Sequence, residues 1–267
     1  MDWWLGTTWD LAAAVLYLFA WVGYGPVMAR AGRRHSINTD MAAVRMRWMR
    51  HMSLRRDSRL IDGQLTGHLL SSASFFTQSN LILIAATAGV LFGGDRAYIA
   101  LKGLPVVAHA PRLLFTLKIG LITVTLARSL LDFIWAIRQL NYMVALVGAA
   151  PDRADDVRLL RYGEICGSLM NTALSTFNSG VRGYYFALAA AAWVFGPAAF
   201  AAATVGAVGL LVYRQHFSDT ARDVRLARAE LEQDDAAGFH PADPVEVQAA
   251  STPTPMGQVT PVPPIPQ

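Results

Sequence analysis

Long apolar runs restrict the fold of this chain more than any other feature of its sequence. They recur at lengths of about 20 residues, which is what a helix needs to cross a bilayer. Charged residues make up only 16% of the 267 residues, against about 25% in soluble domains, and they gather between the apolar runs. Because hydrocarbon cannot bond backbone polar groups, such runs form helices. The sequence therefore predicts an all-α, polytopic transmembrane bundle.

Five spans are expected, and the last two come from dividing one apolar stretch. Residues 184–217 would form a single helix of about 50 Å, which is much longer than a hydrocarbon core of about 30 Å. Gly196 and Pro197 interrupt this stretch, and that pair breaks helices. The expected spans are 9–28, 69–92, 113–137, 169–195 and 198–213.

The distribution of arginine predicts the orientation of these spans. Residues 30–62, which follow the first span, contain nine arginines and three aspartates. Positive charge favours the cytoplasmic side, so the N-terminus is expected outside. Five spans then place the C-terminus in the cytoplasm with four more arginines, Arg214, Arg222, Arg225 and Arg228. The start of the chain lacks the positive segment of a signal peptide, so we expect the first span to be retained.

An internal repeat also favours five spans. Moving the chain by 100 residues places five residues on identical ones: Gly63, Gly67, Leu69, Ala73 and Ser79 on Gly163, Gly167, Leu169, Ala173 and Ser179. Arg138-Gln139 and Arg214-Gln215 follow the third and fifth spans. Spans 2–3 and 4–5 are therefore expected to be two copies of one helical hairpin. The paired glycines predict close helix packing in both copies.

A basic amphipathic helix is expected between the first two spans. Asp40 can cap it, and Met41, Val44 and Met52 share its length with arginines. Because these arginines neighbour apolar spans, we expect the partner to be the bilayer and its anionic headgroups rather than nucleic acid. The expected lipid-interface residues are Arg45, Arg47, Trp48 and Arg50.

A polar stripe is the first candidate site. Its members are spaced by four and three residues, which keeps them on one helix face: Glu164, Ser168, Asn171, Ser175, Asn178 and Arg182. The first hairpin has a weaker version, Gln64, His68, Ser71 and Gln78. Turned inward, the stripes could line a pore for a polar solute, within one chain or between subunits of a homo-oligomer. The alternative is dry, hydrogen-bonded helix packing.

Charges on the third span form the second candidate site. Arg128 and Asp132 are four residues apart, so they can pair directly. When the Arg-Gln pairs that follow the third and fifth spans are aligned, the matching positions of the fifth span hold Thr204 and Val208. An isolated charge at a helix centre costs roughly 2.5–3.5 kcal/mol on insertion scales. The pair is therefore either an ion pair that stabilises the bundle or a functional specialisation of this span. Lys118 is expected to reach outward from its end of the span.

Little in the sequence indicates enzymatic chemistry. Cys166 is the only cysteine, the six histidines lack metal-ligand spacing, and no nucleotide-binding or hydrolase motif is present. We expect no metal, no cofactor and no catalysis. Tyrosines and tryptophans near the span ends, such as Tyr24, Trp135, Tyr142 and Tyr213, are expected to be interfacial anchors. Residues 232–267 are rich in proline, which predicts a disordered tail after a membrane domain of residues 1–231.

Several segments resemble the domain-of-unknown-function 599 family. They are WAIRQLNY at 135–142, GAAP at 148–151 and FNSGVRGYYFAL at 177–188, together with RWM at 47–49 and RLID at 59–62. The resemblance covers about residues 10–220 and implies a helical protein of the bacterial inner membrane. It brings no activity, substrate or site residue. The sequence therefore leaves two functions open, a channel- or transporter-like bundle and a non-catalytic membrane scaffold or assembly factor.

Overall fold

Three helices in this computed structural model run the length of the molecule. The structure describes residues 3–31, 36–55, 59–94, 98–100, 111–152 and 155–236, and these contain no strand. The long helices are α3 (Leu60–Phe92), α5 (Arg112–Gly148) and α6 (Asp156–Ala191). Four further α-helices are shorter: α1 (Trp3–Ala31), α2 (Ile37–Leu54), α7 (Pro197–His216) and α8 (Asp219–Ala236). The predicted all-α fold is confirmed.

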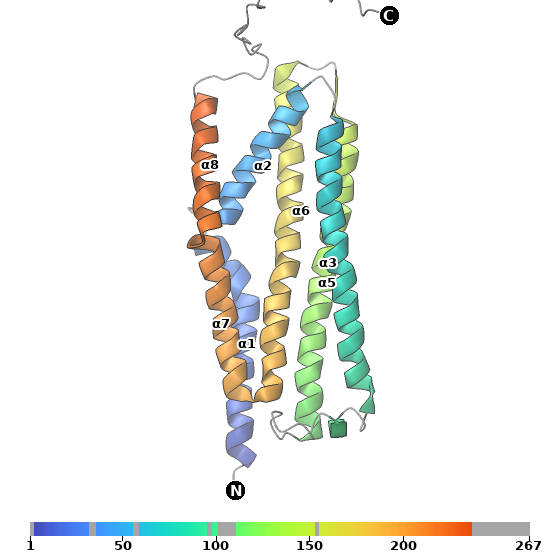
Figure 1. Ribbon diagram of the computed structural model, residues 1–267, viewed down its shortest axis with the longest axis vertical. Helices are drawn as coiled ribbons and strands as arrows, with labels where there is room; N and C mark the ends of the chain where they lie inside the picture. Colours follow the sequence, from blue (N-terminus) through green and yellow to red (C-terminus); the bar gives the residue numbers. More distant parts are fainter. Residues whose placement is uncertain are drawn as a thin grey trace, which may run out of the picture.

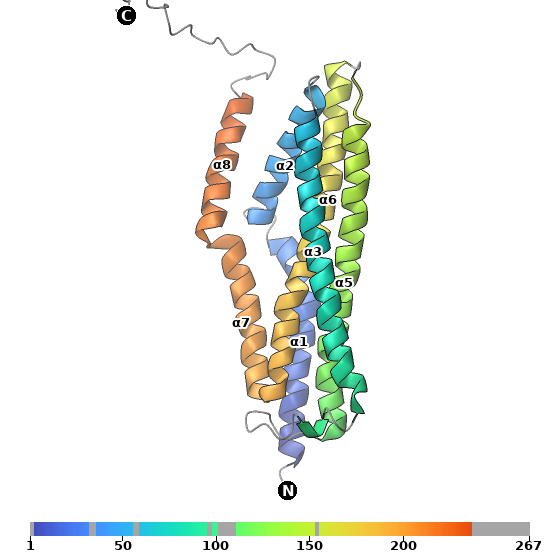
Figure 2. The same cartoon turned by 45° about the vertical axis from the view of Figure 1, so that its right-hand side comes forward.

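The shorter helices divide the bundle into two halves, as Figures 1 and 2 show. In these views α1 and α7 occupy the lower half, and α2 and α8 occupy the upper half. The long helices have 33, 37 and 36 residues, so at 1.5 Å per residue each is about 50–55 Å long. They exceed a hydrocarbon core of about 30 Å and contribute to both halves.

Four helical segments are long and apolar enough to cross a membrane: Thr8–Met28, Leu60–Phe92, Arg112–Gly148 and Pro197–Asp235. Together they fit a membrane protein. The central helix α6 is not among them, because it carries the polar stripe. It packs most extensively on α5 and α2, and it also contacts α7 and α1. A helix covered by protein needs less apolar surface than one that faces lipid.

Each half has its own buried core. In the lower half, Tyr17, Phe186, Phe200 and Trp193 belong to one large apolar cluster. In the upper half, methionines of three helices meet: Met49 and Met52 of α2, Met143 of α5 and Met170 of α6. All four methionines are fully buried. The upper core explains why α2 packs on the bundle.

The break at Gly196-Pro197 is present as predicted. A short 3₁₀ turn, Ala192–Phe195, follows α6. Gly196 then adopts a φ of 123°, which L-residues with a Cβ rarely adopt. Pro197 is the first residue of α7, where its missing N–H costs nothing. The chain therefore turns back on itself at this pair.

The helix ends differ from the expected spans. α3 begins at Leu60 rather than 69, α5 continues past 137 to Gly148, and α6 begins at Asp156 rather than 169. The reason is that the expected bounds followed the apolar runs alone. The amphipathic remainder of each helix packs on other helices and carries no long apolar run.

The expected cap of α2 is also corrected. Ser36, not Asp40, is the N-cap, and its hydroxyl oxygen accepts from Thr39 N at 3.3 Å. Asp40 lies in the first turn, buried, where Arg228 Nη1 of α8 donates to it at 2.9 Å. The sequence did not predict α8, which extends to Ala236. The disordered tail was expected to begin at residue 232, but residues 232–236 belong to α8. The rest of the expected tail, from 237 onward, lies outside the described residues.

Candidate functional site

The polar stripe of α6 faces α2, across a groove between the two helices. Arg45 Nε donates to Asn171 Oδ1 at 2.8 Å, and Asn171 Nδ2 donates to the Ala42 carbonyl at 3.0 Å. Asn178 Nδ2 donates to Asn38 Oδ1 at 3.2 Å. Burial lowers the pKa of Arg45, but a guanidinium stays charged at neutral pH. Two stripe asparagines thus fix one wall of the groove.

The groove holds a cavity of about 570 Å³. Every member of the stripe except Glu164 lines it: Ser168, Asn171, Ser175, Asn178 and Arg182. Glu164 instead pairs with Arg50 of α2, whose Nη2 lies 2.7 Å from Glu164 Oε1. The helical spacing therefore brought these residues together along one cavity wall.

Arg182 is shared by three cavities. The second cavity, of about 330 Å³, lies among α1, α5 and α6 and is lined also by Arg128 and Asp132. The third, of about 540 Å³, reaches Tyr185 of α6 and Arg214 of α7. We call these three cavities, which share Arg182 in their walls, the crevice. It brings the stripe and the charge pair to one place, at the height where α1 gives way to α2 (Figure 1).

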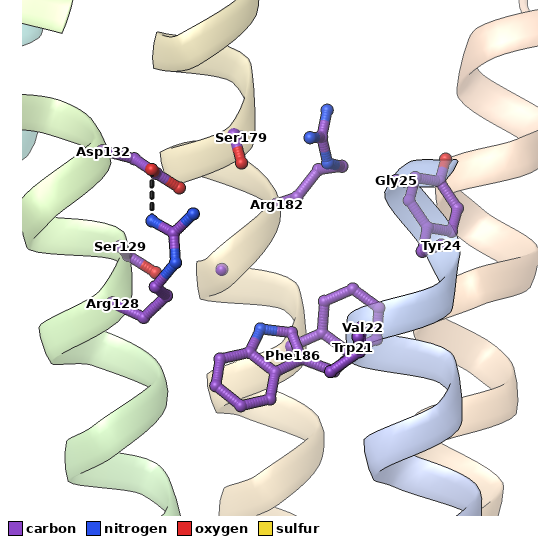
Figure 3. A pocket seen from close by; sticks show the side chains of 11 residues that line it. Trp21, Val22, Tyr24, Gly25, Arg128, Ser129, Asp132, Ser179, Arg182 and Phe186 are labelled. Carbon is purple, nitrogen blue, oxygen red and sulfur yellow. Dashed lines mark hydrogen bonds and ion pairs between the residues drawn. The ribbon is translucent and has the colours of Figure 1, made fainter. Parts of the chain in front are cut away.

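Figure 3 shows the second cavity from close by. Arg128 of α5 donates to Asp132 across one helical turn, so the two charges form a direct ion pair. Arg182 projects from α6 towards Tyr24 of α1, and its guanidinium carbon lies 5.9 Å from the centroid of the Tyr24 ring. Tyr24 was expected to be an interfacial anchor, but it lines this cavity and is 5% exposed.

Buried aromatic rings lie between the second cavity and the N-terminal end of α1. Phe186 lines the cavity, and its ring centroid is 6.0 Å from that of Tyr17. The Tyr17 ring is 5.2 Å from Phe200, which stacks on Trp193 at 4.7 Å. These four rings form an apolar layer under the polar crevice.

A second buried polar cluster lies beyond this layer. Lys118 is 2% exposed, and its Nζ lies 3.7 Å from Asp10 Oδ1. Trp193 Nε1 donates to the same carboxylate oxygen. One face of α5 thus pairs with α1 twice, since Tyr17 and Thr125 are also hydrogen-bonded through their hydroxyls at 2.8 Å. The expectation that Lys118 reaches outward is wrong, because an acidic partner lies inside the bundle.

The weaker stripe of α3 does not reach the crevice. Its four residues, Gln64, His68, Ser71 and Gln78, are all exposed. The buried polar residues of α3 are Asp62, Thr66 and Asn80. These form a different face of the helix, so the two stripes do not line one cavity within a single chain. The difference arises because Ala73, in register with this buried face, packs against α5 and α6.

The expected lipid-interface residues all bond within the protein. Arg45 and Arg50 bond to α6 as described, and Trp48 Nε1 donates to Asp62 Oδ1 at 2.7 Å. Arg47 Nη2 lies 3.2 Å from Asp235 Oδ1 of α8. The structure therefore places the basic helix between α6 and α8, with these four side chains bonded to neighbouring helices.

Other expected residues lie beside the crevice or away from it. Arg214 Nη1 donates to the Tyr185 hydroxyl at 2.6 Å, on the wall of the third cavity. Arg138 and Tyr142 bond to each other at 3.2 Å on the exposed face of α5. In the part of the chain that the structure describes, no group of three His, Cys, Asp or Glu could hold a metal ion.

Comparison with known proteins identifies a family. The model of the family described as "Protein of unknown function, DUF599" matches residues 12–220. This range begins in α1, ends in α8 and contains every residue of the crevice. No curated protein and no solved structure matches the chain.

Proposed function

The chain belongs to the DUF599 family, and we propose that it is a channel- or transporter-like membrane bundle that receives a polar or ionic solute in the crevice. One observation carries this proposal. Three cavities that contain polar and charged side chains share Arg182 in their walls, within a bundle that contains four candidate membrane-spanning helices. Polar and charged groups are costly inside a membrane, and they commonly mark a solute or ion pathway.

The proposed topology has five spans, with α6 as the one that apolarity alone does not identify. α1, α7 and the adjoining halves of α3, α5 and α6 cross the bacterial inner membrane. α2 and α8 then stand on the cytoplasmic side, and the N-terminus lies outside. A reporter fused after Ala236 tests this arrangement, because four spans would instead place it in the periplasm.

Access from one side supports a carrier-like mechanism. The α2–α6 groove leads to Arg182, whereas Tyr17, Phe186 and Phe200 lie buried on the opposite side. A solute could enter from the cytoplasmic end, and passage would then require the aromatic layer to rearrange. Alternating access of this kind places the solute near the middle of the bundle.

We propose that the protein is not an enzyme. The described residues that line the crevice include no histidine, cysteine or lysine. Their one carboxylate, Asp132, is held by Arg128. A nucleophile with an adjacent general base is the usual requirement for acyl or phosphoryl transfer chemistry.

Cysteine labelling tests whether the groove contains water. In a Cys166→Ala background, Ser168→Cys, Ser175→Cys and Asn178→Cys should react with a charged, membrane-impermeant thiol reagent applied to inside-out vesicles. Leu188→Cys is the matched control, since Leu188 lies on the same helix, is 76% exposed and is expected to face lipid. It should stay unreactive.

Protection of all three groove positions would contradict the proposal and favour dry packing. The second candidate function, a membrane scaffold or assembly factor, would then lead. Arg222 and Arg225 on the exposed side of α8 support it, because under the proposed topology they could contact anionic headgroups or a protein partner.

A further inference from the structure

The hydroxyl of Tyr24 is buried without a partner. The residue is 5% exposed, it lines the second cavity, and its oxygen has no hydrogen bond to any residue that the structure describes. A buried tyrosine hydroxyl usually finds a partner, because leaving it unbonded is costly. The hydroxyl can therefore donate to a group that enters the cavity.

Arg182 lacks a partner in the same cavity. Among the crevice arginines, Arg45 bonds to Asn171, Arg128 to Asp132 and Arg214 to Tyr185. Arg182 lies over the Tyr24 ring at 5.9 Å, but the described residues offer it neither a hydrogen bond nor an ion pair. Its guanidinium carries five N–H donors, so it can bind a negatively charged acceptor.

The charge of the crevice favours an anion. Arg45, Arg128, Arg182 and Arg214 line it, against the single carboxylate of Asp132, which leaves a formal charge of 4 − 1 = +3. Most of the surrounding bundle is apolar. Focusing of this charge in a cleft with low-dielectric walls raises the local concentration of anions.

From these observations we propose that Arg182 and Tyr24 together bind an oxyanion, a carboxylate or phosphate group, in the second cavity. The proposal rests on the crevice being the solute site. The guanidinium would hold the negative oxygens, and the Tyr24 hydroxyl would donate to one of them. Figure 3 shows both groups projecting towards the same side of the cavity. Asp132 on the opposite wall would disfavour ligands of high negative charge.

Thermal unfolding of the detergent-purified protein tests this pairing. Inorganic phosphate, sulfate and acetate should raise Tm, with a shift that grows as the logarithm of the anion concentration once this exceeds Kd, at ionic strength held constant with chloride. Arg182→Gln and Arg182→Lys should lose most of the response, because neither side chain has the planar guanidinium that donates two parallel hydrogen bonds to an oxyanion. The matched control is Arg161→Gln, an exposed position on the same helix, which should respond as the wild type does.

Tyr24→Phe separates binding from folding. Removing an unbonded buried hydroxyl should leave Tm in chloride unchanged or higher, while the affinity for the anion falls roughly tenfold. A loss of stability in chloride with unchanged anion affinity would mean that the hydroxyl serves the fold, and would overturn the proposal. Equal responses of wild type and Arg182→Gln, or no response to any anion, would also overturn it.

Bilayer composition distinguishes the source of the oxyanion. In phosphatidylcholine nanodiscs, an Arg182-dependent Tm increase on adding phosphate or acetate identifies a soluble ligand. An Arg182-dependent increase produced by phosphatidylglycerol alone identifies a lipid headgroup. Either result supports the site. Labelling of Asn178→Cys reports water access independently, so a labelled groove with no anion response defeats this inference and leaves the proposed function standing.

Discussion

The stripes of α6 and α3 occupy matching positions in sequence and opposite environments in space. Asn171 bonds to Arg45 and to the Ala42 carbonyl. Ser71, one hundred residues earlier, is exposed and donates only to the Gly67 carbonyl of its own helix, at 3.1 Å. A similar pattern of polar residues therefore forms a cavity wall in one hairpin and an outer surface in the other.

The glycines beside the stripes differ in the same way. A Cβ added at Gly163 would lie 2.7 Å from both Arg50 Cα and the Met49 carbonyl oxygen, and one at Gly167 would lie 2.6 Å from Met46 Sδ. At Gly63, an added Cβ would meet nothing within 4 Å. The predicted close packing is thus present in the second hairpin and absent at this position of the first.

The reason lies in the neighbours of each helix. α6 contacts α5, α2 and α7, whereas α3 packs mainly on α5. A helical period shows which residues share a face, but the period alone cannot show which faces meet another helix. If the two hairpins arose as a repeat, then α2 is the element that made their environments different.

Replacing Gly163 and Gly63 with alanine should change the stability of the protein in opposite directions. Gly163→Ala places a methyl group against the backbone of α2, which must move, and we expect a loss of about 3 kcal/mol. Gly63→Ala should stabilise by up to about 1 kcal/mol, because alanine favours a helix over glycine. Thermal unfolding of both variants in detergent measures this difference. Equal shifts would mean that α2 does not pack closely on α6.

The sequence predicted where most of the helices lie, but it did not predict how long they are. The apolar runs located α1, α3, α5 and α7, and Gly196-Pro197 located the turn before α7. The upper ends of α3, α5 and α6 were missed because they mix polar with apolar residues, and only α6 packs extensively on α2 there. Detecting them requires knowing that Met49 and Met170 meet in one core, which is a tertiary contact.

The site was predictable as a set of residues on one helix. Spacing alone identified the stripe from Ser168 to Arg182, and the pairing of Arg128 with Asp132. It could not identify Tyr24 or Asn38, which come from α1 and α2. Their roles depend on how these helices cross α6, and an aromatic residue near a span end is more often an interfacial anchor.

Asn171→Ala and Ser71→Ala compare the two stripes directly. The first removes two hydrogen bonds and leaves Arg45 without its acceptor, so we expect a loss of about 1–3 kcal/mol. The second removes an exposed hydroxyl and should change stability by less than about 0.5 kcal/mol. Urea-dependent or thermal unfolding in detergent gives both values. A comparable loss at Ser71 would show that the outer face of α3 is covered in the membrane.

The pair Arg128 and Asp132 extends the comparison to the second helix of each hairpin, since α7 has Thr204 and Val208 at the matching positions. The Arg128 side chain is 55% exposed and that of Asp132 15%, so losing either charge should cost only about 1 kcal/mol. Asp132→Asn and Arg128→Gln should each lower the folded yield, because each leaves an unpaired charge.

The double variant decides between a structural and a functional pair. If the pair serves the fold, changing both residues should partly restore the yield. Size-exclusion chromatography in detergent measures this yield without knowledge of the solute. Normal yield for both single variants would instead indicate that Arg128 and Asp132 act on the solute in the crevice.

The ion pair between Glu164 and Arg50 should give the smallest effect. Both side chains are nearly half exposed, at 49% and 43%, and exposed pairs contribute about 0.2–1 kcal/mol. Glu164→Gln should therefore lower Tm slightly at low salt, and the difference should disappear near 1 M salt, where screening acts within about 3 Å. Gln64→Ala, at the matching position of α3, should show neither change. A salt-independent loss at Glu164 would mean that the pair is buried in the membrane-bound protein, and the upper end of the groove would then be closed rather than open to water.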